Sequence, residues 1–232
     1  MPAMVADNGK SLVAKAMEAV KSHIRDAGLH VGDMLPGEGY FAQSLGVSRA
    51  VMREAFGALA ALRLIDVANG RRAKVAALDG SVIADSLEHA LSTAQIKVAD
   101  VWDVRRTIEM RTAALAARNA TPAQADRILA LAEAMSKDDQ PHAQTTEDDI
   151  AFHLAIAEAS GNALFNQIVV SFVPLMRISV PKAWSTQRTE DERRDILGRH
   201  RRLARAIAER DAHAAELAMA AHFDEAIGAL LR

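Results

Sequence analysis

One short stretch of this chain carries the sequence pattern of β-structure, and almost everything else follows helical periodicity. Residues 64–67 and 71–75 are two short extended runs on either side of Asn69-Gly70, a pair that favours a hairpin turn. Elsewhere the apolar residues recur at the three- and four-residue spacing of amphipathic helices. Only 4% of the residues are aromatic, which disfavours an all-β sandwich. The sequence therefore predicts a mainly α protein with a single small hairpin.

Charge and cysteine content limit the classes of function. The 232 residues include 28 Lys and Arg and 30 Asp and Glu, which gives a formal net charge of −2. Residues 1–78 hold 10 of the basic and 7 of the acidic residues, a net of +3, so the remainder carries −5. This asymmetry suggests two domains with different tasks. The absence of cysteine excludes disulfides, Cys-ligated zinc and a thiol nucleophile.

Apolar runs in the chain are short. The longest, residues 168–175, is interrupted by Ser171 and Pro174, and none approaches the roughly 18–20 residues of a spanning helix. The first ten residues contain no apolar run of signal-peptide length. We therefore expect a cytoplasmic protein with no membrane partner.

The first third of the chain has the element order of a helix-turn-helix domain. We expect helices over 11–27, 38–45 and 48–62, with a tight turn at Gly46 and Ser48 as the N-cap of the third helix. The 64–75 hairpin follows, so a basic β-ribbon would lie beside that helix. The predicted architecture is a winged helix-turn-helix domain over residues 8–77.

Basic residues of this domain fall where contact with DNA requires them. Arg49 begins the third helix, and Arg53 follows one turn later on the same face. A recognition helix places its first residues at base edges, where Arg bonds guanine bidentately, while hairpin cations contact phosphate or the minor groove. An Arg pair alone fits a solvated helix face, but the hairpin and turn spacing favour DNA. The candidate DNA-binding residues are Ser48, Arg49, Arg53, Gly70, Arg71, Arg72 and Lys74.

Residues 78–232 carry helical patterns only. The expected spans are 81–94, 98–119, 122–138, 143–160, 163–184 with breaks at Pro174 and Pro181, 189–210 and 212–231. Seven amphipathic helices in about 150 residues predict an all-α antiparallel bundle with one core. The sequence shows no Gly-rich phosphate loop and no nucleophile elbow.

Three histidines and one carboxylate fall on apolar or small-residue stripes of these helices. Asp149 and His153 share one helix face, and His200 and His222 lie on two later helices. Facing helices of a bundle can gather such groups around a metal ion. A His on an apolar stripe is more often a hydrogen-bonded core residue, and Asp149 with His153 also fits a local helical hydrogen bond. The spacing alone leaves these alternatives open.

Arg105 lies on an inward-facing stripe of the helix expected over 98–119. Burial of an unpaired guanidinium is costly, so this side chain needs a partner. Glu109, one turn later, is one candidate partner, and an anionic ligand held bidentately is the other.

The first of these domains resembles the winged helix-turn-helix of the GntR family of bacterial transcription regulators. The matching pieces are Leu35-Pro36 with Glu38, Leu45 to Arg49, Arg53 to Ala55, Leu64-Ile65 and Gly70-Arg71. Two positions depart from the family pattern. Gly39 stands where relatives commonly have an Arg that contacts DNA, and Arg72 stands where the wing usually has Gly.

Residues 98–232 resemble the FCD ligand-binding domain of the FadR subfamily. The matching pieces are Val101 to Glu109, Ala114 to Arg118, Asp149 to His153, Gly161-Asn162, and His200 with His222. The resemblance implies that Asp149, His153, His200 and His222 bind a divalent transition metal. Zinc is the first choice, with nickel, iron or manganese as alternatives. It also implies that Arg105 binds the carboxylate of a small organic acid, such as a sugar acid, hydroxy acid or dicarboxylate.

Both resemblances together predict a metabolite-responsive transcription regulator, in this family most often a repressor, with no catalytic residues. We expect a homodimer on a palindromic double-stranded DNA operator, because a symmetric dimer requires symmetric half-sites. One alternative is a metal-dependent enzyme built on the bundle, with Glu109 as its available general base. The other is a constitutive DNA-binding protein with a purely structural metal site.

Overall fold

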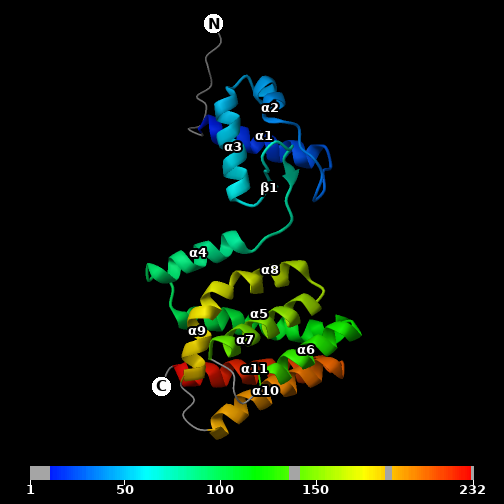
Figure 1. Ribbon diagram of the computed structural model, residues 1–232, viewed down its shortest axis with the longest axis vertical. Helices are drawn as coiled ribbons and strands as arrows, with labels where there is room; N and C mark the ends of the chain where they lie inside the picture. The colour runs from blue at the N-terminus through cyan, green and yellow to red at the C-terminus, as the bar shows by residue number, and fades with distance from the viewer. Residues whose placement is uncertain (1–10, 136–141, 186–189, 231–232) are drawn as a thin grey trace. The chain divides into compact units, whose positions relative to one another are not determined.

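The computed structural model describes residues 11–135, 142–185 and 190–230. Parts of the expected first domain and of three expected helices lie outside the described residues: 8–10, 136–138, 189 and 231. By its internal contacts the chain divides into two units, Met1–Val82 and Ile83–Arg232. The fold is mainly α, with a winged helix-turn-helix followed by a helical bundle, as the sequence predicts (Figure 1).

The first unit contains α1 (Leu12–Asp26), α2 (Glu38–Leu45), α3 (Arg49–Ala61), β1 (Ile65–Asp66) and β2 (Lys74–Val75). The tight turn between α2 and α3 depends on Gly46, whose φ of 65° lies in the left-handed region that glycine tolerates. Ser48 then begins α3, because its Oγ accepts a hydrogen bond from the Val51 N–H at 3.2 Å. Val20 and Leu59 are fully buried in the core beneath these helices.

The wing is a shorter hairpin than the sequence suggests. Only Ile65 pairs with Val75, and Asp66 with Lys74, so the extended runs expected over 64–67 and 71–75 are too long. The carbonyl of Ala73 instead accepts a hydrogen bond from Leu35 N–H at 2.8 Å. This bond draws Ala73 toward the core and leaves residues 67–73 as a loop, with Gly70 at its centre and a φ of 71°.

The second unit contains α4 (Ser81–Ser92), α5 (Val98–Asn119), α6 (Pro122–Ala134), α7 (His142–Ala159), α8 (Ala163–Ser171), α9 (Val173–Ser185), α10 (Glu190–Ala208) and α11 (Ala212–Leu230). The expected breaks at Pro174 and Pro181 were wrong. The chain breaks at Phe172, because Pro174 belongs to the first turn of α9, where its missing N–H costs nothing. Pro181 lies inside α9 without ending it.

None of the described helices alone is long and apolar enough to cross a membrane, and α8 and α9 reach the necessary apolar length only together, as a pair bent by 51°.

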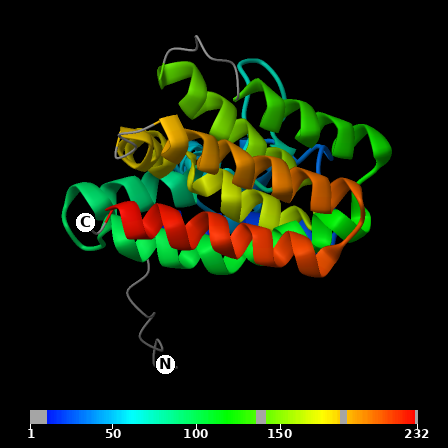
Figure 2. The same cartoon turned by 90° about the horizontal axis from the view of Figure 1, so that it is seen from below.

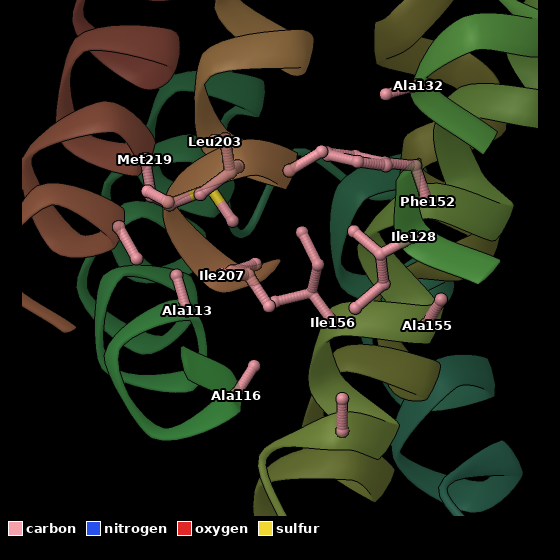
Figure 3. Packing of buried hydrophobic residues seen from close by; sticks show 14 of the residues in the cluster. Ala113, Ala116, Ile128, Ala132, Phe152, Ala155, Ile156, Leu203, Ile207 and Met219 are labelled. Carbon is pink, nitrogen blue, oxygen red and sulfur yellow. The ribbon is translucent and has the colours of Figure 1, made fainter. Parts of the chain in front are cut away.

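The main core of the bundle lies among α5, α6, α7, α10 and α11. In Figure 2, α11 runs beside α5, and the two helices are in contact along their length. Ala113 and Ala116 are fully buried on α5, and such small side chains permit close packing of helices. Figure 3 shows Ile128, Ile156 and Ile207 pointing toward one another from α6, α7 and α10. This packing fixes the helices that carry the buried polar groups.

Candidate metal centre and DNA-reading surface

Four buried side chains of the bundle converge on one point. Asp149 and His153 come from α7, His200 from α10 and His222 from α11. One ligand atom from each lies within 4.8 Å of the others, although the residues are up to 73 positions apart. Their exposed fractions are 4%, 1%, 1% and 9%. The structure thus brings together all four residues that the sequence and the resemblance single out.

Two of these histidines are held by their outer ring nitrogens. Nδ1 of His200 lies 3.0 Å from the Ile196 carbonyl oxygen and donates to it. Nδ1 of His153 lies against Oε2 of Glu109 and donates to that carboxylate. Each ring therefore turns Nε2 toward Asp149. Anchoring of the outer nitrogen is the usual arrangement for a metal-ligating imidazole.

The inner atoms need a positive charge between them. His200 Nε2 lies 3.0 Å from Asp149 Oδ1, and both atoms present lone pairs unless a proton or a metal ion lies between them. His153 Nε2 is buried without a hydrogen-bond partner among the described residues, and it lies 3.9 Å from Asp149 Oδ2. The local helical hydrogen bond between Asp149 and His153 is therefore not formed. The donor set of three imidazoles and one carboxylate fits a divalent transition metal.

The pKa shifts in the cluster favour the forms that bind metal. Burial would raise the pKa of Asp149, but the hydrogen bond with His200 and the charges of the neighbouring histidines hold it well below its usual range. Burial lowers the pKa of His222 well below the usual value, and His200 and His153 lower it further. An ionised carboxylate and a neutral imidazole are the protonation states of metal ligands.

Arg105 lies fully buried beside this cluster. Its Nε donates to Glu109 Oε1 at 2.7 Å, so the partner proposed from the sequence is present. Its guanidinium carbon lies 5.1 Å from the ring centres of both Trp102 and Phe223. Arg105 Nη1 has no hydrogen-bond partner among the described residues. One donor of this cation is therefore available to a ligand.

Glu109 is ionised although it is buried. Burial would raise the pKa of this carboxyl, but Arg105 and His153 outweigh that effect and lower it. From the sequence, Glu109 is expected only as a partner of Arg105 or as a general base. The contact of Glu109 with His153, 44 positions away along the chain, is not predicted by the sequence pattern. No local pattern reports such a contact between α5 and α7.

The surface of the first unit keeps its candidate DNA-binding residues exposed. Arg49 and Arg53 project from the first turns of α3. Arg53 Nε lies 3.8 Å from a carboxylate oxygen of Glu38, a long and exposed ion pair that competes little with phosphate. Ser48 also caps α3, so its hydroxyl already has a structural partner. The remaining candidates Gly70, Arg71, Arg72 and Lys74 lie exposed on the wing.

Gly39 changes the surroundings of Arg49. A Cβ added to Gly39 would lie 3.8 Å from Arg49 Nη2. The tip of Arg49 therefore lies beside the position where relatives carry their additional Arg. Gly39 itself has no side chain, and the guanidinium of Arg49 is the cationic group within 4 Å of its Cβ position.

A winged helix-turn-helix joined to a helical bundle with a buried Asp-His cluster defines a two-domain transcription regulator. A family model described as "Bacterial regulatory proteins, gntR family" matches residues 12–75, and the FCD domain model matches residues 100–225. This chain belongs to the GntR family of regulators and carries an FCD domain, a combination that fits the FadR subfamily. The family consists of regulators and not enzymes, so the enzyme alternative was wrong.

Individual relatives agree with this assignment. The chain is 31% identical to the Glc operon transcriptional activator of Escherichia coli, over 93% of this chain and 87% of the relative. It is 29% identical to the galactonate operon transcriptional repressor of Escherichia coli, over 81% and 82%. Among solved structures, Streptococcus agalactiae GntR has a TM-score of 0.65 at 24% identity, covering 92% of this chain and 97% of that one, which supports the fold.

Proposed function

We propose that this chain is a homodimeric, metabolite-responsive repressor that binds a palindromic double-stranded DNA operator. Residues 8–77 are the DNA-binding domain, and residues 78–232 are the dimerisation and effector-binding domain of a cytoplasmic protein without a membrane partner. The observation that carries the proposal is the buried Asp-His cluster beside Arg105, whose Nη1 has no partner among the described residues.

In this proposal Asp149, His153, His200 and His222 hold a divalent transition metal. Zinc suits the ligand set best, and nickel, iron or manganese are alternatives. When bound, the ion supplies a Lewis-acidic centre for an oxygen of the effector. The four side chains orient that centre and exclude bulk water, because all four are buried.

The charge of the site favours an acidic effector. Asp149 and Glu109 are carboxylates with lowered pKa values, and Arg105 balances Glu109. An imidazole that binds a metal is neutral, so a divalent ion leaves the site with one net positive charge. A buried uncompensated charge is costly, and an anion removes that cost. We therefore propose a small organic acid whose carboxylate contacts Arg105 Nη1, and the galactonate operon named in one relative fits this class.

The response of DNA binding to such an acid tests the proposal. We expect D-galactonate or L-lactate, added to the zinc-loaded protein, to change its affinity for the operator, because an effector that favours one dimer geometry shifts its population. Fluorescence anisotropy with an operator duplex measures this, with acetate as the control acid that lacks a hydroxyl. If metal binds but no organic acid alters operator affinity, the constitutive alternative is correct.

DNA reading by Arg49 gives a separate prediction. Arg49→Ala should cost about 1–3 kcal/mol of operator binding, roughly 5- to 150-fold in Kd, and relax base preference at one position. Arg63→Ala is the matched control, because Arg63 is exposed in the same unit but pairs with Asp79 at 3.4 Å. Titration of both variants against a set of operator mutants measures the effect. An equal loss on every sequence would show that Arg49 contacts phosphate and does not specify a base.

A further inference from the structure

The two carboxylate oxygens of Glu109 contact two different functional side chains. Oε1 accepts from Arg105 Nε at 2.7 Å, and Oε2 lies against His153 Nδ1. All three side chains are 1% exposed. A buried carboxylate is stable only when its oxygens are paired, and here each oxygen has a different partner. Glu109 therefore links His153, a residue of the metal cluster, to the neighbouring cation Arg105.

We propose that Glu109 is a positioning residue that sets the orientation of the metal ligand His153 and of the anion-binding group Arg105 at the same time. The inference rests on the proposed function of the FCD domain as a metal and acid site. It adds a residue that neither binds the metal nor contacts the acid, and without which both groups lose their direction.

The effect on His153 follows from the two ring nitrogens. A neutral imidazole carries one N–H, and the contact with Glu109 places it on Nδ1. Nε2 is then a lone-pair donor directed toward Asp149, 3.9 Å from its Oδ2. Without an acceptor at Nδ1 the ring is free to carry its proton on Nε2, where the proton competes with a metal ion for that atom.

The effect on Arg105 follows from its flat guanidinium. Trp102 and Phe223 pack around that group, with ring centres 5.1 Å from its central carbon. The bond from Nε to Glu109 then fixes the rotation of the group among these rings. Nη1 remains as the donor without a partner among the described residues. A ligand carboxylate therefore meets a donor that is already oriented, which lowers the entropy cost of binding.

An amide cannot replace this carboxylate, although it has the same shape. Both partners of Glu109 are donors, since Arg105 Nε and His153 Nδ1 each offer an N–H. In Glu109→Gln the single carbonyl oxygen accepts the hydrogen bond from the charged Arg105, and the amide NH₂ faces His153. The NH₂ group then donates to Nδ1, so the proton of the ring moves to Nε2. In the variant, the ring must therefore return its proton to Nδ1, against the amide NH₂, before Nε2 can bind a metal, and this weakens binding.

The experiment compares wild-type protein with Glu109→Gln. In the metal-free proteins, ¹⁵N NMR of the imidazoles should show the Nδ1–H tautomer of His153 in the wild type and the Nε2–H tautomer in the variant, with His153→Gln providing the assignment. Zinc affinity, measured by competition with a chromophoric chelator, should fall about 10- to 100-fold, the usual effect of removing a partner of a metal ligand. A wild-type tautomer with wild-type zinc affinity would overturn the inference.

Two further variants keep this result specific. Glu158→Gln is the control for an ordinary ion pair, because Glu158 binds Arg127 at 2.9 Å on the exposed side of α7, and it should bind zinc as the wild type does. Glu109→Asp keeps the charge but is too short to reach both partners, so its zinc affinity should also fall. An unchanged Glu109→Asp would show that the bridge is unnecessary. Failure of the wild type to bind zinc would instead contradict the proposed function.

Discussion

Zinc should raise the melting temperature of the wild-type protein, and His222→Ala should abolish most of that rise. Removing one of four ligands weakens binding by more than removing an outer partner, which already costs about 10- to 100-fold. At a zinc concentration 1,000-fold above Kd, binding stabilises the folded state by about 4 kcal/mol. For a protein of this size that corresponds to roughly 8–16 °C.

His213→Ala is the matched control for this prediction, since His213 lies on the same helix but is exposed. Differential scanning fluorimetry of both variants, with and without zinc, measures the effect. The pKa of His222 is lowered by burial and by its histidine neighbours, so the side chain is neutral and its loss uncovers no charge. An equal zinc-dependent rise in His222→Ala and wild type would place the metal elsewhere.

Arg105→Ala should lower the free energy of unfolding of the metal-free protein by about 3–5 kcal/mol. Breaking a buried ion pair leaves an uncompensated charge, and that cost exceeds the loss of the contact itself. The charge left behind is that of Glu109, which is 1% exposed and keeps only His153 as a partner. The same variant should lose any response to organic acid, because Nη1 is removed.

The neighbouring Arg106 provides the control for that substitution. Arg106 is paired with a carboxylate too, donating to both oxygens of Asp224 at 2.7 and 3.0 Å. That pair is exposed, so Arg106→Ala should cost only about 0–1 kcal/mol. Urea unfolding followed by circular dichroism measures both. Equal losses in the two variants would mean that Glu109 is not held as a buried charge.

Local signals were sufficient to predict the DNA-binding domain. Gly46 and Ser48 determine where α2 ends and α3 begins through backbone geometry and capping, which depend on adjacent residues only. The wing was less predictable. The length of β2 is limited by the hydrogen bond between Ala73 and Leu35, two residues that lie far apart in the sequence. Both prolines expected to break the chain lie in α9: Pro174 is in its first turn, where a proline does not interrupt a helix, and Pro181 lies inside the helix without ending it.

For the metal cluster, helical spacing identified the side chains that lie on the apolar, inward-facing stripes of the helices. It did not show which of these stripes face each other. That ambiguity is why Asp149 with His153 was compatible with a local hydrogen bond, and only the resemblance to a family favoured ligands. Contacts between helices decide the question, and they depend on packing across tens of residues. The contact of Glu109 with His153 likewise depends on the packing of α5 against α7 and could not be read from local spacing.

Phe223 packs between the histidines of the metal cluster and the core of the bundle. Its ring centre lies 5.4 Å from that of His222, 6.0 Å from that of His153 and 5.5 Å from that of Trp102 on α5. Close-packed interiors transmit displacement because they have little free space to absorb it. A displacement of His222 would therefore be passed through Phe223 to Trp102 on α5.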